Sequence, residues 1–235
     1  MTSDDPDADA RRFAHESVAA GDPTGWFDRL YAAAADGQAI VPWDRGTGHP
    51  MFLQWAEATG LQGDGFRAVV VGCGTGENAE YLAKQGFDTV AFDISPAAVR
   101  MAQERFPHSP VDYLVADLLD VPVSWRHAFD LVVEIFTVQS LPPALHIPAI
   151  INTGMLVRAG GTLLVVAAAG DTPPEQDAGP PWPLTRDEVA AFGTDGLDLV
   201  HLEELPGPVD PSDRRWRAEF RRADVRPEVR RVAFG

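Results

Sequence analysis

The sequence predicts an α/β fold built on a doubly wound, seven-stranded and mostly parallel sheet. Short apolar runs that suit strands buried on both faces alternate along the chain with segments of helical pattern. The first expected strand, 67–71, is followed by glycines at 72, 74 and 76 and then by a helix from Glu77. A strand, a glycine-rich turn and a helix form the opening unit of a nucleotide-binding sheet, because glycine lets the backbone approach a ligand closely.

The composition is that of one globular protein with a strongly acidic balance. The chain has 235 residues, of which 45% are hydrophobic, and its formal net charge is -16. This charge argues against a nucleic acid or a membrane as partner, because phosphates attract Lys and Arg. The single cysteine, Cys73, excludes an intramolecular disulfide and a cysteine-rich zinc site, and we expect no metal. Without a spanning apolar run or a secretory signal, we expect a cytoplasmic protein.

The expected elements fall into two regions. The segment 1–49 is expected to be a helical lid that closes over the ligand site and builds part of its pocket, and 50–235 is expected to be a domain built on the sheet. Helices are expected at 8–20, at 24–36 with Thr24 as N-cap, and from Pro50 to Thr59. The expected strands are 67–71, 89–92, 112–115, 129–134, 162–168, 197–203 and 214–220, and the helices between them are 77–85, 96–105, 143–157 and 185–192. The last two strands have no helix between them and should pair antiparallel.

The glycine turn distinguishes two types of nucleotide site. A dinucleotide-binding turn reads G-x-G-x-x-G and holds a pyrophosphate, but here Glu77 takes the place of its third glycine and would repel phosphates. The run V-V-V-G-C-G-T-G instead resembles motif I of the class I S-adenosylmethionine (SAM) methyltransferases. In that family the turn wraps around the methionine part of SAM. The resemblance therefore implies SAM as the cofactor.

Acidic residues end the next two expected strands, where ligands bind in such sheets. Asp93 can accept hydrogen bonds from both hydroxyls of a ribose. Asp117 can accept from an adenine amino group, and Leu118 can pack on the adenine ring. The fourth expected strand ends at Glu134, and the methyl group should point toward the segment that follows it.

The motifs A-F-D-I-S, V-A-D-L and F-D-L-V-V-E follow motif I in the order and spacing of class I methyltransferases. The resemblance covers about 66–170 and implies the strand order 3-2-1-4-5-7-6. It implies that the cofactor is bound by residues at the strand ends, by the start of the first sheet helix and by a tryptophan ahead of motif I. These residues are Trp43, Gly72, Gly74, Gly76, Asn78, Asp93, Ile94, Asp117, Leu118 and Glu134.

Two flanking stretches resemble the thiopurine- and thiol-methyltransferase-like branch of this family. They are 41–50, V-P-W-D-R-G-T-G-H-P, and 138–143, V-Q-S-L-P-P. In that branch the tryptophan packs over the cofactor, and the segment after strand four meets SAM and substrate. The chain departs from the branch at His146, where an arginine is expected, and this departure leaves the substrate open.

Glu134 and His146 are the candidate catalytic residues. Glu134 could bind the SAM amino group, act as a base, or do both. We prefer His146 to His49 and His201 as a base because it follows the fourth strand, although each of these histidines could equally be structural. Cys73 is interpreted as a packing residue, because no base stands at a suitable spacing.

Aromatic side chains suit a flat, apolar methyl acceptor. The candidate substrate residues are Tyr31, Trp43 and Trp182. The alternatives are a core role for Tyr31, as for its neighbour Phe27, a surface position for Trp43, and an inert loop around Trp182.

The predicted function is SAM-dependent methyl transfer to a small molecule at sulfur, oxygen or nitrogen. Since no secure base is evident, the prediction leans slightly toward a thiol, which is partly ionised at neutral pH. The alternatives are a non-catalytic SAM-binding domain and an NAD-dependent oxidoreductase on the same sheet. The sequence does not indicate an oligomeric state.

Overall fold

The computed structural model describes residues 7–208 and 210–224. The helices are α1 (Ala8–Ala19), α2 (Gly25–Ala35), α3 (Pro50–Thr59), α4 (Glu77–Lys84), α5 (Pro96–Arg105), α6 (His146–Leu156) and α7 (Arg186–Ala190). The strands are β1 (Arg67–Val71), β2 (Asp88–Asp93), β3 (Asp112–Val115), β4 (Phe129–Ile135), β5 (Val157–Gly170), β6 (Leu184–Thr185), β7 (Leu197–Pro206) and β8 (Arg214–Arg222). Short 3-10 turns are η1 (Leu118–Asp120), η2 (Val123–Trp125), η3 (Val138–Ser140) and η4 (Pro143–Leu145).

The strand order is β3-β2-β1-β4-β5-β8-β7. This confirms the predicted order once the additional strand β6 is left out of the numbering. β8 lies antiparallel to β5 and to β7, as expected. The prediction of seven strands was wrong by one, because β6 adds an eighth strand beside the end of β5. β6 has only two residues, too few for a periodic pattern, so it is defined by its pairing with Ala169 and Gly170.

Helices cover both faces of the sheet, which explains why its central strands are continuous apolar runs. On one face, Phe52 of α3, Leu82 of α4 and Val99 of α5 pack in a single cluster with alternate residues of the strands. On the other face, Ile150 of α6 and Val189 of α7 pack against the remaining strand residues. None of the helices in the described part of the chain combines the length and the apolar character needed to cross a bilayer.

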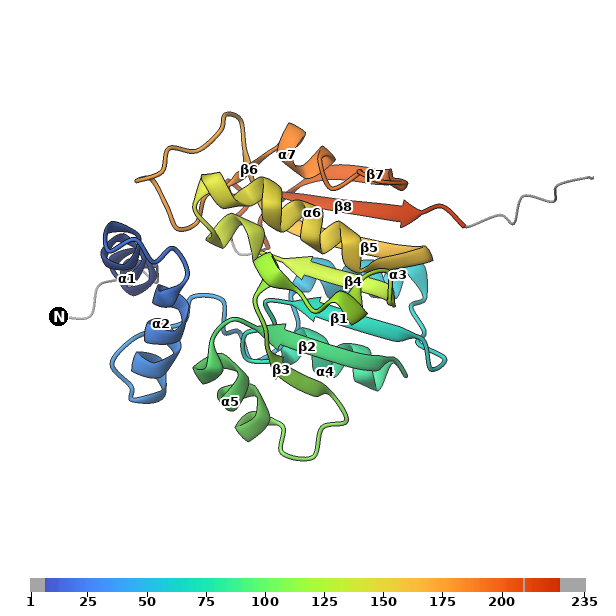
Figure 1. Ribbon diagram of the computed structural model, residues 1–235, viewed down its shortest axis with the longest axis horizontal. Coiled ribbons are helices and arrows are strands. Elements are labelled where there is room, and N and C mark those ends of the chain that lie inside the picture. The colour runs from blue at the N-terminus through green and yellow to red at the C-terminus, as the bar shows by residue number, and fades with distance from the viewer. Residues whose placement is uncertain (1–6, 209, 225–235) are drawn as a thin grey trace, which may run out of the picture.

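The N-terminal helices lie at the carboxyl end of the parallel strands, beside α5 (Figure 1). Trp26 and Leu30 of α2 are fully buried in a third cluster that includes residues of α5. The α2 carboxylate of Asp28 accepts hydrogen bonds from the Ser95 hydroxyl and the Ala97 N–H, both at 2.8 Å. Side-chain contacts at the start of α5 therefore hold α2 against the sheet domain.

Two helix starts differ from the prediction. Thr24 occupies the N-cap of α2 but its side chain makes no capping bond. The carboxylate of Asp22 instead accepts from the backbone N–H groups of Thr24 and Gly25. The helix expected at 143–157 begins as the 3-10 turn η4 and becomes α-helical at His146.

Candidate functional site

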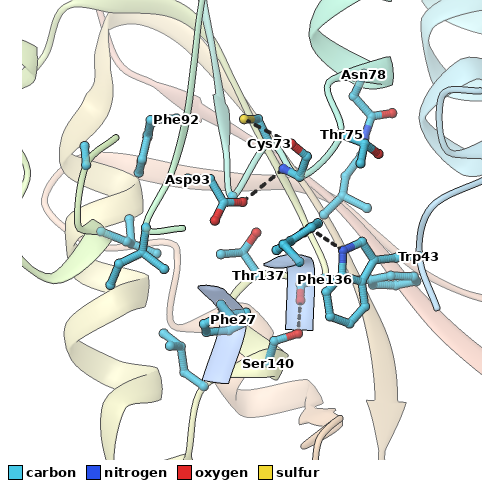
Figure 2. A pocket seen from close by; sticks show the side chains of 18 of the residues that line it. Phe27, Trp43, Cys73, Thr75, Asn78, Phe92, Asp93, Phe136, Thr137 and Ser140 are labelled. Carbon is cyan, nitrogen blue, oxygen red and sulfur yellow. Dashed lines mark hydrogen bonds between the residues drawn. The ribbon is translucent and has the colours of Figure 1, made fainter. Parts of the chain in front are cut away.

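A cavity lies at the carboxyl ends of β1 to β4, between these strands and the N-terminal segment. Figure 2 shows Asp93 and Trp43 approaching it from opposite sides. Most residues predicted for the cofactor and the acceptor line this cavity. They are Tyr31, Trp43, Gly72, Gly74, Asn78, Asp93, Ile94, Asp117 and Leu118. The structure does not bring Gly76, Glu134, His146 or Trp182 to the lining.

The glycine turn needs its glycines for two different reasons. Gly74 has φ +53°, and a Cβ there would lie 2.8 Å from the Tyr31 hydroxyl oxygen, so the backbone itself forms the wall of the cavity. Gly76, with φ +97°, faces the Tyr113 ring instead, and a Cβ there would meet the Tyr113 hydroxyl oxygen. Gly76, which was expected to contact the cofactor, does not line the cavity, and its missing side chain allows close packing against β3.

Asp93 lies between two backbone segments at the centre of the site. One carboxylate oxygen accepts from the Gly74 N–H and the other from the Ser95 N–H, each at 3.0 Å. Burial raises the pKa of Asp93 to about 6, although these N–H groups act to lower it. A carboxylate has about four acceptor positions, so both oxygens can also accept from the hydroxyls of a ribose.

The adenine side of the predicted site is formed by the start of η1. The Asp117 carboxylate accepts from the Leu119 N–H at 2.8 Å and lies on the cavity wall. Leu118 is buried and adds an apolar surface beside it. The bare backbone of the glycine turn, the Asp93 carboxylate and this apolar edge fit the chemical parts of SAM, which are an amino acid, a ribose and a flat base.

Helix α2 presents two faces with different roles. Trp26 and Leu30 enter the protein core, whereas Thr24, Phe27 and Tyr31, at positions i, i+3 and i+7, line the cavity. The sequence analysis offered a core role for Phe27, and this spacing is a readable sign of the second face. Within the cavity wall, the Trp43 indole N–H donates to the Tyr31 hydroxyl at 2.6 Å.

The loop that carries Trp43 is held by an ion-pair cluster. The Arg105 guanidinium, at the end of α5, makes two hydrogen bonds to the Asp44 carboxylate at 2.8 and 2.7 Å. The same guanidinium pairs with Glu77, the first residue of α4. We name Asp44, Arg105 and Glu77 the loop clasp. It joins the loop beside Trp43 to the helix that follows the glycine turn.

Glu134 does not reach the cavity. One carboxylate oxygen accepts from the Thr137 and Val138 N–H groups, at 2.8 and 2.9 Å, and the other is buried with no partner among the described residues. Burial raises the pKa of Glu134 to about 7, with these N–H groups opposing the shift. Glu134, which was expected to contact cofactor or acceptor, instead binds backbone N–H groups of the loop after β4 and so organises that loop.

His146 is fully buried and both of its ring nitrogens are engaged. Nδ1 lies 2.8 Å from a Glu188 carboxylate oxygen and Nε2 lies 2.9 Å from the Leu141 carbonyl oxygen. Burial acts to raise the pKa of Glu188, but hydrogen bonds from His146 and Thr185 outweigh it and lower that pKa. The structure contradicts a catalytic role for His146, because the ring joins α6 to α7 and lies away from the cavity.

Trp182 is buried by its own loop and does not line the cavity. Its indole N–H donates to the carbonyl oxygens of Glu175 and Gln176, both at 3.1 Å. The expected substrate contact is therefore wrong, because the large ring forms the core of the loop before β6.

The loop after β4 supplies cavity residues that the sequence analysis did not single out. Phe136 has φ +63°, a conformation that non-glycine residues seldom adopt, and the surrounding contacts hold it there. Ser140 donates to the Phe136 carbonyl oxygen at 2.7 Å (Figure 2). The Thr137 hydroxyl donates to the Val71 carbonyl oxygen at 2.9 Å and faces Gly72.

The His49 ring forms another part of the wall and lies edge-on to the Phe136 ring, with centroids 4.9 Å apart. It was considered as a base, yet no sequence pattern placed it in the cavity.

Comparison with known proteins places these features in a family context. The methyltransferase domain family matches residues 69–165, which include the glycine turn, Asp93 and Asp117. A probable thiol methyltransferase 2 from Arabidopsis thaliana is 26% identical over 216 residues, covering 88% of this chain and 91% of the relative. A thiocyanate methyltransferase 1 from Brassica oleracea is 26% identical over 206 residues, covering 86% and 84%.

Among solved structures, the fold is similar to the N-methyltransferase NodS from Bradyrhizobium japonicum, which was determined with S-adenosylhomocysteine. The TM-score is 0.64 at 20% identity, and the match covers 83% of this chain and 98% of that one. At this identity the likeness shows a shared fold.

Replacing Asp93 by Asn keeps an oxygen for one backbone N–H but removes the charge and one acceptor. We expect SAM affinity at pH 8 to fall by about tenfold or more, since hydrogen bonds to a charged group contribute about 1.5–3 kcal/mol. In the wild type, affinity should also fall below pH 6, because protonation of Asp93, whose pKa is about 6, removes the same charge. Calorimetry from pH 5 to 8, with Asp112→Asn as control, tests this, and an equally pH-dependent affinity in Asp93→Asn contradicts it.

Replacing Arg105 by Met removes the loop clasp but keeps the apolar stem of the side chain. We expect SAM to bind about three- to tenfold more weakly, because a partly exposed ion-pair network contributes about 1 kcal/mol and holds the loop beside Trp43. The control is Arg100→Met, because Arg100 is an exposed residue of the same helix and has no ion pair among the described residues. Equal SAM affinities for the two variants would contradict the role of the clasp.

Glu134→Gln should flatten the pH dependence of stability. The folded protein keeps a proton on Glu134 up to about pH 7, whereas the unfolded chain loses it near pH 4.5. The free energy of unfolding therefore falls as pH rises through this window, by about 3 kcal/mol from this group. Urea unfolding between pH 5 and 8 measures the slope, with the exposed Glu104→Gln as control. An unchanged slope in Glu134→Gln is the contrary result.

Proposed function

We propose that this chain, a class I SAM-dependent methyltransferase, transfers the methyl group to the sulfur atom of a small thiol. The thiol and thiocyanate methyltransferases to which it is similar over most of its length support a sulfur acceptor. The methyltransferase domain match also overturns the alternative of an NAD-dependent oxidoreductase on the same sheet. The net charge of -16 argues against a nucleic acid as the acceptor and so supports a small molecule.

When bound, SAM supplies an electrophilic methyl group carried on a sulfonium. Gly72 and Gly74 would hold its methionine part, Asp93 its ribose, and Asp117 with Leu118 its adenine. The chain itself then has to align an acceptor and exclude water. Alignment of two reactants can by itself supply several kcal/mol of a barrier reduction, about 7–11 in the most favourable cases.

The observation that carries the proposal is the lack of a free base among the described cavity residues. Of the three carboxylates that line the cavity, Glu77 pairs with Arg105, and Asp93 and Asp117 are the proposed ligands of the ribose and the adenine. An acceptor that needs a proton removed by the enzyme, such as an alcohol, therefore finds no assistance here.

The other titratable side chains of the cavity are also unsuited to take a proton. Burial and then the Asp93 charge raise the pKa of Tyr31 well above its usual value, so its phenol stays neutral. Burial, again with the Asp93 charge, raises the pKa of the Cys73 thiol. Burial and the charges of Arg45 and Arg215 lower the pKa of His49 to about 4, and its Nδ1 already accepts from the Met51 N–H.

A thiol meets these conditions because its reference pKa of about 8.5 leaves a few per cent of reactive thiolate at neutral pH. The acceptor side of the cavity is aromatic, with Phe27, Tyr31, Trp43 and Phe136 in its wall. Such a wall excludes water and suits an apolar or flat acceptor.

We also propose that the segment 1–49 acts as a lid on the domain at 50–235. Tyr31 and Trp43 line the cavity from this segment, and their mutual hydrogen bond joins α2 to the following loop. Asp28 and Asp44 bind the two ends of α5. These two attachments hold the lid in a defined position against the sheet domain.

Turnover with SAM and three acceptors of one shape tests the sulfur assignment. We expect thiophenol to be methylated at least about a hundredfold faster than phenol or aniline, as judged by kcat/KM with product identified by mass spectrometry. With an alkyl thiol of pKa about 8.5, the rate should rise about tenfold per pH unit below that value, because it follows the thiolate fraction. Comparable rates with phenol or aniline would show that the acceptor atom is not sulfur.

A further inference from the structure

Both ring nitrogens of His146 lie beside oxygen atoms that belong to hydrogen-bond acceptors. Nε2 lies 2.9 Å from the Leu141 carbonyl oxygen, and a carbonyl oxygen has no hydrogen to donate. Nδ1 lies 2.8 Å from one carboxylate oxygen of Glu188. The His146 side chain is fully buried, so solvent does not replace either partner. The number of hydrogens on the ring therefore depends on whether Glu188 is ionised.

Glu188 is held in its ionised form. Its second carboxylate oxygen accepts from the backbone N–H and from the hydroxyl of Thr185, both at 2.8 Å, in the capping box that begins α7. Burial acts to raise the pKa of Glu188, but the hydrogen bonds from His146 and Thr185 outweigh it and lower that pKa. Because an ionised carboxylate only accepts, the hydrogen between Glu188 and His146 is on Nδ1.

Both ring nitrogens therefore carry a hydrogen, and His146 is an imidazolium. A buried cation is costly unless it is paired and hydrogen-bonded. Here Glu188 provides the opposite charge, and the two acceptors use both N–H groups of the ring. Among the described residues, Glu188 is the one ionisable side chain that bonds the ring.

The Leu141 carbonyl that His146 binds belongs to the loop after β4, which forms part of the cavity wall. The residues of this loop that line the cavity are Phe136, Thr137, Ser140 and Leu141. Glu134 accepts from N–H groups at the start of the loop, and His146 donates to a carbonyl at its end. A buried ionisable side chain thus fixes each end of this part of the wall.

We propose that His146 is a positioning residue, held as an imidazolium, which fixes the loop after β4 for binding of the methyl acceptor. It acts through the Leu141 carbonyl and does not itself line the cavity. A charged N–H donor makes a stronger hydrogen bond than a neutral one, so the protonated ring restrains Leu141 more firmly. The role in acceptor binding rests on the proposed methyl transfer, whereas the charge of the ring does not.

NMR of protein with ¹⁵N-labelled histidine at pH 7 measures the charge of the ring. Both ring nitrogens of His146 should show the chemical shift of a protonated nitrogen, and their signals are assigned by their absence from the spectra of His146→Gln and His146→Asn. An unprotonated ring nitrogen at His146 in the wild type overturns the proposal, whether or not either variant folds.

His49 is the internal control for a neutral ring. Burial and the charges of Arg45 and Arg215 lower its pKa to about 4, and its Nδ1 accepts from the Met51 N–H. This Nδ1 should therefore show the chemical shift of an unprotonated nitrogen in the same spectrum.

Two variants separate the two hydrogen bonds of His146. His146→Asn places an amide N–H near the position of Nδ1, so it keeps the bond to Glu188 and loses the bond to Leu141. His146→Gln places an amide N–H near the position of Nε2 and keeps the bond to Leu141. By calorimetry on the full chain loaded with S-adenosylhomocysteine, we expect thiophenol to bind about tenfold more weakly to His146→Asn and less than about threefold more weakly to His146→Gln.

Equal thiophenol affinities in the two variants, or a larger loss in His146→Gln, overturn the positioning role. The latter result is expected if His146 serves only to join α6 to α7, because the Gln variant loses the bond to Glu188. Wild-type protein that binds thiophenol without methylating it contradicts the proposed function and leaves the positioning role intact. Wild-type protein that does not bind thiophenol overturns both the thiol assignment and the positioning role, and the NMR result for the imidazolium stands by itself.

Discussion

The buried carboxylate of Asp93 is the contact on which the site depends. Its two oxygens accept from Gly74 in the turn after β1 and from Ser95 at the start of α5. A charge this buried is costly unless hydrogen-bonded, and backbone N–H groups from two neighbouring loops meet that need. The same hydrogen bonds hold the turn after β1 and the start of α5 at a defined distance from each other. The width of the cavity between them therefore depends on the stabilisation of the Asp93 carboxylate.

Helix α5 extends this constraint to the N-terminal segment. Asp28 binds the beginning of the helix, at Ser95 and Ala97, and Arg105 at its other end binds Asp44. One helix of the sheet domain thereby carries both α2 and the loop beside Trp43. Since Arg105 also pairs with Glu77 at the start of α4, the wall formed by the N-terminal segment is coupled to the glycine turn that it faces.

Most polar groups near the cavity stabilise loops and leave few for chemistry. Glu134 holds the turn that carries Phe136 and Thr137, and His146 joins α6 to α7 through Glu188. Phe27, Tyr31, Trp43 and Phe136 form an aromatic part of the remaining wall. Such a site is suited to align reactants that need no proton transfer, which is consistent with a preformed nucleophile such as a thiolate.

The sequence by itself determined the glycine turn and the positions of Asp93 and Asp117 in the cavity, because each of them follows a strand directly and all parallel strands end on one edge. The strand order came from the resemblance to the class I methyltransferases, and the structure confirms it. Only the tertiary structure decided where Glu134, His146 and Trp182 point. Glu134 shares a face of β4 with the buried Val132, and the other two rings are enclosed by neighbouring segments. The tertiary structure also decided that His49 lines the cavity, because its contact with Phe136 and its hydrogen bond to Asn78 join segments that are distant in the sequence, and local spacing does not encode such contacts.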